Sequence, residues 1–462
     1  MGTDKRAWHH PLVTVAWSLA TVVFVSSQAG ADSVLRSSTP PLAAWTELGP
    51  SGITIVRAIT EQAQCPSIEL DTASHPLQVR AQPSPPAFPV LVCETVVPPG
   101  TGSATINGQP LPLPKPAPHR IVVIGDTGCR LKTGLPPQAC NDPQAWPFAK
   151  VARSAATWAP DLVIHVGDYF YREAPCPAGS AECAGSPWGN HWDAWRADFF
   201  EPASPLLRAV PWVLARGNHE RCGRAGEAWF RFLDPHSWSP ACQDYTAPYG
   251  IPLGEVQLLV LDSANAEDDR APGEKVAAYA AQFTALQDLA TTKEAWLLMH
   301  HPLWGVGWAK GADKTRGLTY PNATLQAAAG SRLPPHLRFV LSGHLHTFEL
   351  LSFAHGRSPQ LVVGSGGTEL LQTPALSVSH LTVAGELVVT GMTLNRFGYL
   401  TLEWSAEGWV ATARGVDGEA LSTCLMRPRE MTACTAQPGG ARYGECSLAL
   451  RSGSAFARDG QR

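Results

Sequence analysis

The feature that most constrains the fold is a short apolar run followed by closely spaced metal-ligand side chains. The run Phe339–Leu341 leads through Ser342 and Gly343 into His344 and His346. Side chains two residues apart on an extended backbone point the same way. A bend at the glycine would let both imidazoles face neighbouring metal positions. A lone His-x-His pair is common on surface loops, so its meaning depends on the rest of the chain.

Four earlier apolar runs end in matching chemistry. They are 121–124 before Asp126, 162–166 before Asp168 and Tyr171, 210–215 before Asn218 and His219, and 296–299 before His300 and His301. A glycine stands before Asp126, Asp168, Asn218 and His344, and we expect it to let the chain turn tightly. Helical spacing over 146–158 and 274–291 separates the runs. This alternation predicts sheet strands joined by crossover helices, with functional groups beyond the strands' carboxyl ends.

The donor types predict a metal site. Any single Gly-Asp after a strand is usually a turn or a helix cap. The joint occurrence of five such ends favours a shared site instead. Carboxylate and amide oxygens mixed with imidazoles suit zinc, iron or manganese. The set is too large for one ion, so we predict two metals about 3.5–4 Å apart with a shared carboxylate.

These segments resemble the five motifs of the calcineurin-like metallophosphoesterases. The tyrosine three residues after Asp168, Tyr171, makes the second motif similar to that of one branch, the purple acid phosphatases. The resemblance implies an α/β fold, a two-sheet βα sandwich, here preceded by a small all-β domain. It implies one metal held by Asp126, Tyr171 and His346, a second held by Asn218, His300 and His344, and Asp168 bridging both.

In that branch the first metal is Fe³⁺ and the second is Zn²⁺, Fe²⁺ or Mn²⁺. His219 would lie just outside the ligands as the general acid, or else orient them. Plant and mammalian members supply another histidine after the His300 segment, but residues 304–314 contain none. We expect His301 or Trp304 to line the pocket instead, and we count His301 with His219 as a catalytic candidate.

The predicted function is that of an exported, metal-dependent phosphatase. It would hydrolyse phosphate monoesters of small molecules by attack of a hydroxide that the metals activate. The alternatives are a phosphodiesterase or nucleotidase on the same site, separated by loops 174–188 and 305–320, and a non-catalytic metal- or phosphate-binding protein. A net charge of -4 indicates neither a nucleic-acid partner nor a polybasic membrane patch.

Residues 1–31 have the pattern of a signal peptide, which predicts a periplasmic or extracellular location. Lys5 and Arg6 precede an apolar run over 12–25 and the small residues Ala29–Ala31. The alternative is a retained membrane anchor, although the run is short for a span, and we expect no stable anchor.

Eleven cysteines support export. They fall into local pairs that predict disulfides: 65 with 93, 129 with 140, 176 with 183, 222 with 242, and 424 with 434. Cys446 is left over, although a 434–446 pair is an alternative. The alternative, zinc binding by these cysteines, is not favoured because the sequence contains no Cys-x-x-Cys pair.

We predict four segments. After the signal peptide come an N-terminal β domain with a Pro-rich linker (32–118), the catalytic domain (119–426) and a loop-rich tail (427–462). The alternative for the second segment is an irregular extension packed on the catalytic domain. Strand-like runs between 361 and 414 predict a second sheet. His165 is expected in the core, and Asn322-Ala323-Thr324 fits a glycosylation acceptor.

Overall fold

Two large sheets carry the predicted strand ends. The computed structural model describes residues 40–291, 293–308, 317–320, 322–371, 377–427 and 430–436. The predicted signal peptide, Cys446 and the last part of the tail lie outside the described residues. All the described residues belong to one compact unit.

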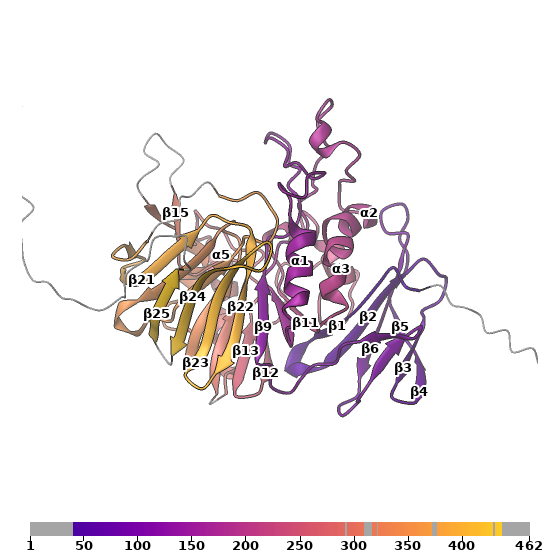
Figure 1. Ribbon diagram of the computed structural model, residues 1–462, viewed down its shortest axis with the longest axis horizontal. Helices are drawn as coiled ribbons and strands as arrows, with labels where there is room; N and C mark the ends of the chain where they lie inside the picture. Colours follow the sequence, from indigo (N-terminus) through magenta and orange to yellow (C-terminus); the bar gives the residue numbers. More distant parts are fainter. Residues whose placement is uncertain are drawn as a thin grey trace, which may run out of the picture. The chain divides into compact units, whose positions relative to one another are not determined.

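The first sheet has eleven strands in the order β25-β24-β23-β22-β9-β10-β11-β1-β2-β6-β5 (Figure 1). Its centre is parallel: β9 (Arg120–Ile124), β10 (Leu162–His165) and β11 (Trp212–Leu214). One flank holds β22 (Gly398–Ser405), β23 (Gly408–Gly415), β24 (Ala420–Arg427) and β25 (Glu430–Ala436). The other holds β1 (Ala43–Leu48), β2 (Thr54–Thr60), β6 (Leu91–Val97) and β5 (Gln78–Ala81).

The second sheet has eight strands in the order β12-β13-β14-β17-β19-β18-β21-β20. β13 (Val256–Val260), β14 (Glu294–Leu298), β17 (Leu337–Ser342) and β19 (Gln360–Val363) run parallel. The others are β12 (Tyr249–Leu253), β18 (Phe348–Phe353), β21 (Glu386–Leu394) and β20 (Thr382–Val383). A hairpin of β15 (Gly305–Trp308) and β16 (Gly317–Tyr320) forms its own small sheet.

Alternation along the strands explains why the two sheets stack. Ile121 and Val123 of β9 pack against Leu258 and Val260 of the second sheet. Val122 and Ile124, on the opposite face of β9, belong to the core that contains the first group of helices. Successive residues of a strand point to opposite faces, so a fully apolar strand is buried on both. This confirms the predicted two-sheet sandwich.

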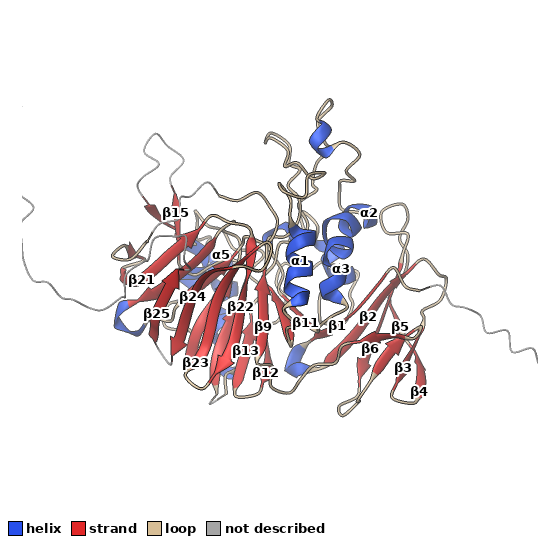
Figure 2. Cartoon of the chain, in the orientation of Figure 1, coloured by secondary structure: helices blue, strands red, loops and turns tan. Residues whose placement is uncertain are grey.

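Helices cover the outer faces of both sheets. α1 (Phe148–Thr157), α2 (Trp192–Trp195), α3 (Glu201–Leu207) and α4 (Gly226–Phe232) share a core with the first sheet (Figure 2). α5 (Gly273–Leu289) and α6 (Ala323–Ala329) share a core with the second sheet. The helices expected over 146–158 and 274–291 are confirmed as α1 and α5.

The N-terminal region extends the central sheet. β1 pairs with β11 in parallel, with Glu47 opposite Trp212. Only β3 (Ser67–Leu70), β4 (Ala73–Pro76), β7 (Ala104–Ile106) and β8 (Gln109–Leu111) form a separate four-stranded sheet. The region is all-β, as predicted, but it shares a sheet with the site strands, and its boundary at residue 118 stays a prediction.

Buried arginines fasten this region to the C-terminal end of α4 and the residue pair that follows it. The Arg57 guanidinium donates to the carbonyl of Phe232 (2.9 Å), and Arg80 donates to the carbonyls of Phe230 (2.7 Å) and Asp234 (2.8 Å). Both arginines also pair with the Glu94 carboxylate. Buried charges that are paired and hydrogen-bonded resist separation, because removing one partner leaves the other uncompensated.

The C-terminal strands differ from the prediction of one second sheet. β19 and β21 do enter the second sheet, but β22 pairs antiparallel with β9 and so places β22 to β25 in the first. The tail predicted as loop-rich from residue 427 begins instead with β25. An antiparallel hairpin can extend either sheet edge, and the run of apolar residues does not say which.

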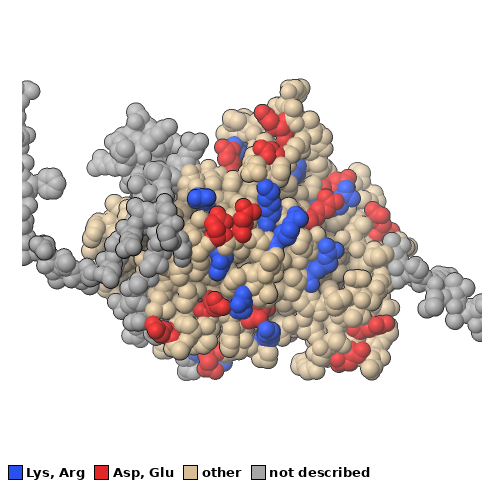
Figure 3. All heavy atoms as spheres, viewed as in Figure 1, with Lys and Arg blue, Asp and Glu red and all other residues tan. Residues whose placement is uncertain are grey.

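All five predicted cysteine pairs are disulfides: 65–93, 129–140, 176–183, 222–242 and 424–434. Among the described residues, none of the helices combines the length and apolar character needed to cross a bilayer. On the face shown in Figure 3, lysines and arginines are interspersed with acidic side chains. That face therefore carries no large field of one sign.

Candidate metal centre

The parallel strands of both sheets bring the predicted ligands to one edge. Asp126, Asp168 and Asn218 follow β9, β10 and β11, whereas His300 and His344 follow β14 and β17. The backbone at Asp126, Asp168 and His344 adopts positive φ angles of 54°, 58° and 69°. Such left-handed residues, when not glycine, are uncommon and gather at functional sites.

The glycines before these residues serve a different purpose from the predicted one. Of the four, Gly167 alone has a positive φ, of 106°. A Cβ on Gly217 would lie 2.1 Å from Asp168 Oδ1, and one on Gly343 would lie 2.3 Å from Asp126 Oδ2. These two glycines therefore make room for the carboxylates, while the ligand residues themselves take the tight turn.

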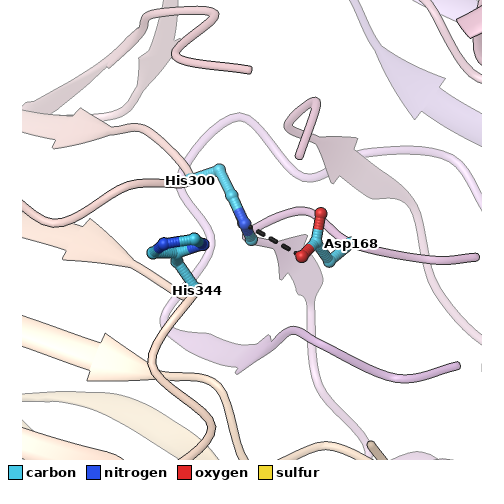
Figure 4. Close-up of side chains that lie close together, drawn as sticks. All are labelled: Asp168, His300 and His344. Carbon is cyan, nitrogen blue, oxygen red and sulfur yellow. Dashed lines mark ion pairs between the residues drawn. The ribbon is translucent and has the colours of Figure 1, made fainter. Parts of the chain in front are cut away.

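Three side chains converge on what we call the second position. Asn218 Oδ1 lies 3.0 Å from His300 Nε2 and 2.9 Å from His344 Nδ1. His300 Nε2 also lies 3.2 Å from Asp168 Oδ2, and Figure 4 shows His300 pointing at that carboxylate with His344 beside it. Ligand atoms of Asp168, His300 and His344 all lie within 4.8 Å of one another. One ion could contact all four side chains.

The remaining ligands lie on the other side of Asp168, at what we call the first position. Tyr171 Oη is 2.9 Å from Asp126 Oδ1, 2.9 Å from Asp168 Oδ2 and 3.1 Å from His346 Nε2. Both groups therefore meet at Asp168 Oδ2. This is the arrangement that a bridging carboxylate between two ions requires. The structure brings together all seven predicted ligands.

The electrostatics of the residues alone also fit bound cations. Burial raises the pKa of Asp126 well above its usual range, and burial with the two carboxylates raises the pKa of Tyr171 likewise. Burial lowers the pKa of His300, but the charge and hydrogen bond of Asp168, the charge of Asp126 and the Val166 carbonyl together outweigh it and raise that pKa to about 9. Two fully buried carboxylates and a phenol in contact are costly without positive charge. The donor set fits two metal ions.

Two buried carboxylates that sequence reasoning did not single out hold the ligand loops. Asp198 accepts hydrogen bonds from the backbone N–H of Cys129 (2.9 Å) and Tyr171 (2.7 Å). Glu220 accepts from the N–H of Asp168 (3.1 Å) and Tyr169 (2.9 Å). Glu220 follows His219 directly, so its position in the sequence was a usable signal. Asp198 lies between α2 and α3, away from any strand end, and offered none.

His219 lies beside the shared carboxylate. Its Nε2 is 3.8 Å from Asp168 Oδ2, its backbone N–H donates to Asp168 Oδ1 (2.8 Å), and its ring lies 3.8 Å from the ring of Tyr171. Its Nδ1 lies 3.0 Å from the carbonyl of Phe170 and 3.1 Å from Glu173 Oε1. The outer nitrogen is thus held by an acceptor, while Nε2 faces the site.

Arg224 completes the surroundings of His219. Its guanidinium lies 2.7 Å from His219 Nδ1 and 2.9 Å from Nε2, and it donates to Glu173 Oε1 at 2.6 Å. Neither Arg224 nor Glu173 was singled out from the sequence, because both lie in loops without a recognisable pattern.

His301 and Trp304 differ as pocket candidates. The His301 ring lies 4.2 Å from that of His344, and its Nδ1 is 3.3 Å from Ser263 Oγ. It is buried but adjoins the second position. Trp304 packs in the core 5.5 Å from the ring of Phe353, with the Arg357 guanidinium over it. The prediction that Trp304 could line the pocket is therefore wrong.

Two other predictions concern residues near the site. His165 is fully buried, lies 3.1 Å from Thr127 Oγ1 and stacks on Tyr169, which confirms a core role. Asn322 is also buried, and its amide caps α6 and bonds to Asp268. A side chain used in this way is not open to glycosylation, so the acceptor pattern is fortuitous.

Comparison with known proteins agrees with this geometry. A family profile described as Calcineurin-like phosphoesterase matches residues 119–348, which span every predicted ligand. No curated protein matches the chain by sequence.

Among solved structures, the purple acid phosphatase PPD1 from yellow lupin (Lupinus luteus) seeds is similar in fold. It shows a TM-score of 0.53 and 15% identity over 82% of this chain and 73% of its own. A structure of PhoD gives a TM-score of 0.54 and 13% identity over 87% and 94% of the two chains. Identities this low show a shared fold alone. Through residues 119–348, the chain belongs to the calcineurin-like phosphoesterase family.

Proposed function

We propose that this protein is an exported phosphatase that hydrolyses phosphate monoesters of small molecules at a dinuclear metal centre of the purple acid phosphatase type. The observation that carries the proposal is the meeting of two donor groups at Asp168 Oδ2. Tyr171 Oη contacts that oxygen from one side and His300 Nε2 from the other.

Each of the two metal ions would have its own set of ligands. Asp126, Tyr171 and His346 would hold one ion, and Asn218, His300 and His344 the other, with Asp168 between them. Bound cations at these positions screen the negative charge of a phosphate ester and lower the pKa of water. Without them, the buried Asp168 carboxylate would repel the substrate, since its pKa lies well below the usual range.

His219 is the proposed general acid. Its Nε2 faces Asp168, and a proton there would lie on the side of the site where the ester binds. Nδ1 faces the carbonyl of Phe170 and the Glu173 carboxylate. Burial lowers the pKa of His219, and the carboxylates of Asp168 and Glu173 offset this only in part, so the ring gives up an Nε2 proton readily. Protonation of the leaving oxygen typically contributes about 10²–10⁴-fold in rate.

Arg224 supports recognition of a phosphate group. Its guanidinium lies against His219 and pairs with Glu173, which places a compensated cation beside the site. A guanidinium suits phosphate because its donors match two oxygens at once. His301, behind His344, is proposed to shape the floor of the pocket.

We also propose Fe³⁺ at the first position and Zn²⁺, Fe²⁺ or Mn²⁺ at the second. A phenolate with two carboxylates suits a trivalent ion, whereas imidazoles and an amide suit a divalent one. The five disulfides support export, because such bonds persist in oxidising compartments.

The test is hydrolysis of matched chromogenic phosphate mono- and diesters by the purified, metal-loaded protein. An Asp168→Ala variant is the matched control, since it removes the carboxylate shared by both positions. Fast monoester turnover that disappears in the variant is the expected result. Turnover of diesters alone would replace the proposal with a phosphodiesterase, and silence toward both with two metals bound would favour a binding protein.

A further inference from the structure

A carboxylate outside the predicted ligand set contacts the second position. Asp268 lies in the loop between β13 and α5, and its Oδ2 is 2.9 Å from His344 Nε2. Because His344 Nδ1 faces Asn218 Oδ1, the contact with Asp268 uses the opposite nitrogen of the same ring.

This contact determines which nitrogen of His344 carries the proton. A ligand nitrogen must be free of hydrogen, so the proton of a neutral His344 sits on Nε2 when Nδ1 binds a metal. Asp268 Oδ2 is placed to accept that proton's hydrogen bond. A carboxylate in this place fixes the tautomer and the ring angle and makes the imidazole a stronger ligand.

Asp268 is itself held in place. Asn322 Nδ2 donates to Asp268 Oδ1 at 2.9 Å, while Asn322 Oδ1 accepts from the backbone N–H of Leu325 at 2.8 Å. The backbone carbonyl of Asp268 also accepts from the N–H of Ala323 (2.9 Å). The amide of Asn322 therefore caps α6 with its oxygen and orients Asp268 with its nitrogen.

The other two imidazoles are supported differently. The outer nitrogen of His300 lies 2.9 Å from the carbonyl of Val166, and that of His346 lies 2.9 Å from the carbonyl of Glu369. A backbone carbonyl orients a ring without adding a full charge. Asp268 adds one, next to a position whose own ligands, apart from Asp168, are neutral.

We propose that Asp268 and Asn322 are positioning residues that set the affinity of the second metal position. The hydrogen-bonded series Asn322–Asp268–His344 connects the start of α6 to the metal ligand His344. This inference rests on the dinuclear centre of the proposed function, but its test measures metal binding rather than turnover.

The experiment titrates metal-free protein with Zn²⁺ against a chromogenic chelator and counts the equivalents and their affinities. Asp268→Ala is expected to weaken one of two equivalents by about 10–100-fold and to leave the other unchanged. Asp268→Asn is expected to weaken it less, since the amide oxygen still accepts a hydrogen bond. Asn322→Asp retains the acceptor that caps α6 but places a second carboxylate against Asp268. It should lower the affinity of the same zinc equivalent.

Glu267→Gln is the matched control, because the neighbouring Glu267 side chain pairs with Lys275 and Arg270 and not with the site. It should leave both affinities unchanged. Thermal unfolding of each metal-free variant separates a lost fold from a lost ligand, and Asp268→Asn keeps the test open if Asp268→Ala does not fold.

Two results would overturn the inference. Unchanged affinities in Asp268→Ala would show that Asp268 does not act on His344. Loss of a separate third equivalent, with the first two intact, would make Asp268 a ligand in its own right, with His301 and His344 as neighbours. If the wild-type protein bound two metals as described yet hydrolysed no phosphate ester, the proposed function would fail and this inference would stand.

Discussion

The first and second metal positions share one carboxylate and one sheet edge but differ in chemistry. The first gathers Asp126, Tyr171 and His346, so oxygen donors dominate and two of the three can carry negative charge. The second gathers Asn218, His300 and His344, which are all neutral when they bind a metal. Additional negative charge comes from the Asp268 carboxylate, which contacts the outer nitrogen of His344.

One fold can thus present two chemically unlike sites on either side of a single carboxylate. Anionic oxygens in direct contact favour a highly charged ion, whereas neutral nitrogens favour a divalent one that exchanges more readily. The first position draws on the loops after β9 and β10 and, through His346, on the loop after β17, whereas the second draws on the loops after β11, β14 and β17. The two positions should therefore be separable by substitution of their own ligands.

The largest expected effect comes from removing one imidazole at each position. His300→Ala should release the metal of the second position, and His346→Ala that of the first, while each variant retains the other metal. Both should lose about 10³-fold or more in turnover, since ligands of one centre act as a unit. Metal analysis after gel filtration checks the content of each variant.

His355→Ala provides the histidine control for this pair, because the His355 side chain is 81% exposed and pairs with Glu386. It should retain both metals and full turnover. Loss of both metals from either His300→Ala or His346→Ala would show that the positions fill as one, and would remove the basis of the comparison.

The sequence predicted that the candidate ligands of both positions would meet, because each follows an apolar strand and parallel strands bring their carboxyl ends to the same edge. Their division into two sets came from the resemblance to the purple acid phosphatases and stays a prediction. The sequence did not predict Asp268, which lies in an acidic loop after β13 where no strand end or spacing marks it. Nor did it place β22 to β25 beside β9, since that choice depends on which sheet edge a hairpin meets.

The next effect concerns proton transfer, which the two positions share through Asp168. His219→Asn should lower turnover of alkyl phosphates by about 10²–10⁴-fold, because a poor leaving group needs a proton. Aryl phosphates, whose phenolates leave without one, should lose much less. The ratio of the two rates in wild type and variant is the measurement. An equal loss on both substrates, with unchanged metal content, would assign His219 an orienting role instead.

A smaller effect on turnover, with a clear spectral signature, is expected at the first position. Tyr171→Phe removes the phenol but keeps its ring against His219. If Fe³⁺ binds there, the visible charge-transfer band of the wild-type protein should vanish while the second metal stays bound. Tyr399→Phe is the control, because Tyr399 bonds to Ser154 on α1, remote from the site. A colourless, fully active wild-type zinc protein would contradict Fe³⁺ at this position.

The smallest effect uses a buried carboxylate that neither position includes. Glu349 on β18 is fully buried, and it accepts from the backbone N–H of Val306 at 3.0 Å. Burial raises its pKa from the ordinary 4.5 to about 8, and the hydrogen bond from Val306 offsets this only in part. Asp126 and Asp168 are equally buried, so Glu349 indicates what a carboxylate costs in this interior when no bound cation compensates it.

The sign of the effect follows from the raised pKa. Below pH 4.5 both the folded and the unfolded chain hold the proton on Glu349, whereas between 4.5 and about 8 the folded chain alone holds it. Stability therefore falls as the pH rises through this window. Glu349→Gln should match wild type near pH 5 and exceed its free energy of unfolding at pH 8. The expected gain is on the order of a few kcal/mol, at about 1.4 kcal/mol for each pKa unit.

Denaturant unfolding at both pH values, with matched metal content, measures this difference. Glu403→Gln is the control, since Glu403 forms an exposed pair with Arg120, and such pairs contribute little at any pH. Equal stability of wild type and Glu349→Gln at pH 8 would show that this interior tolerates a bare carboxylate. The burial of Asp126 and Asp168 would then no longer argue for cations at the two metal positions, and their case would rest on donor geometry alone.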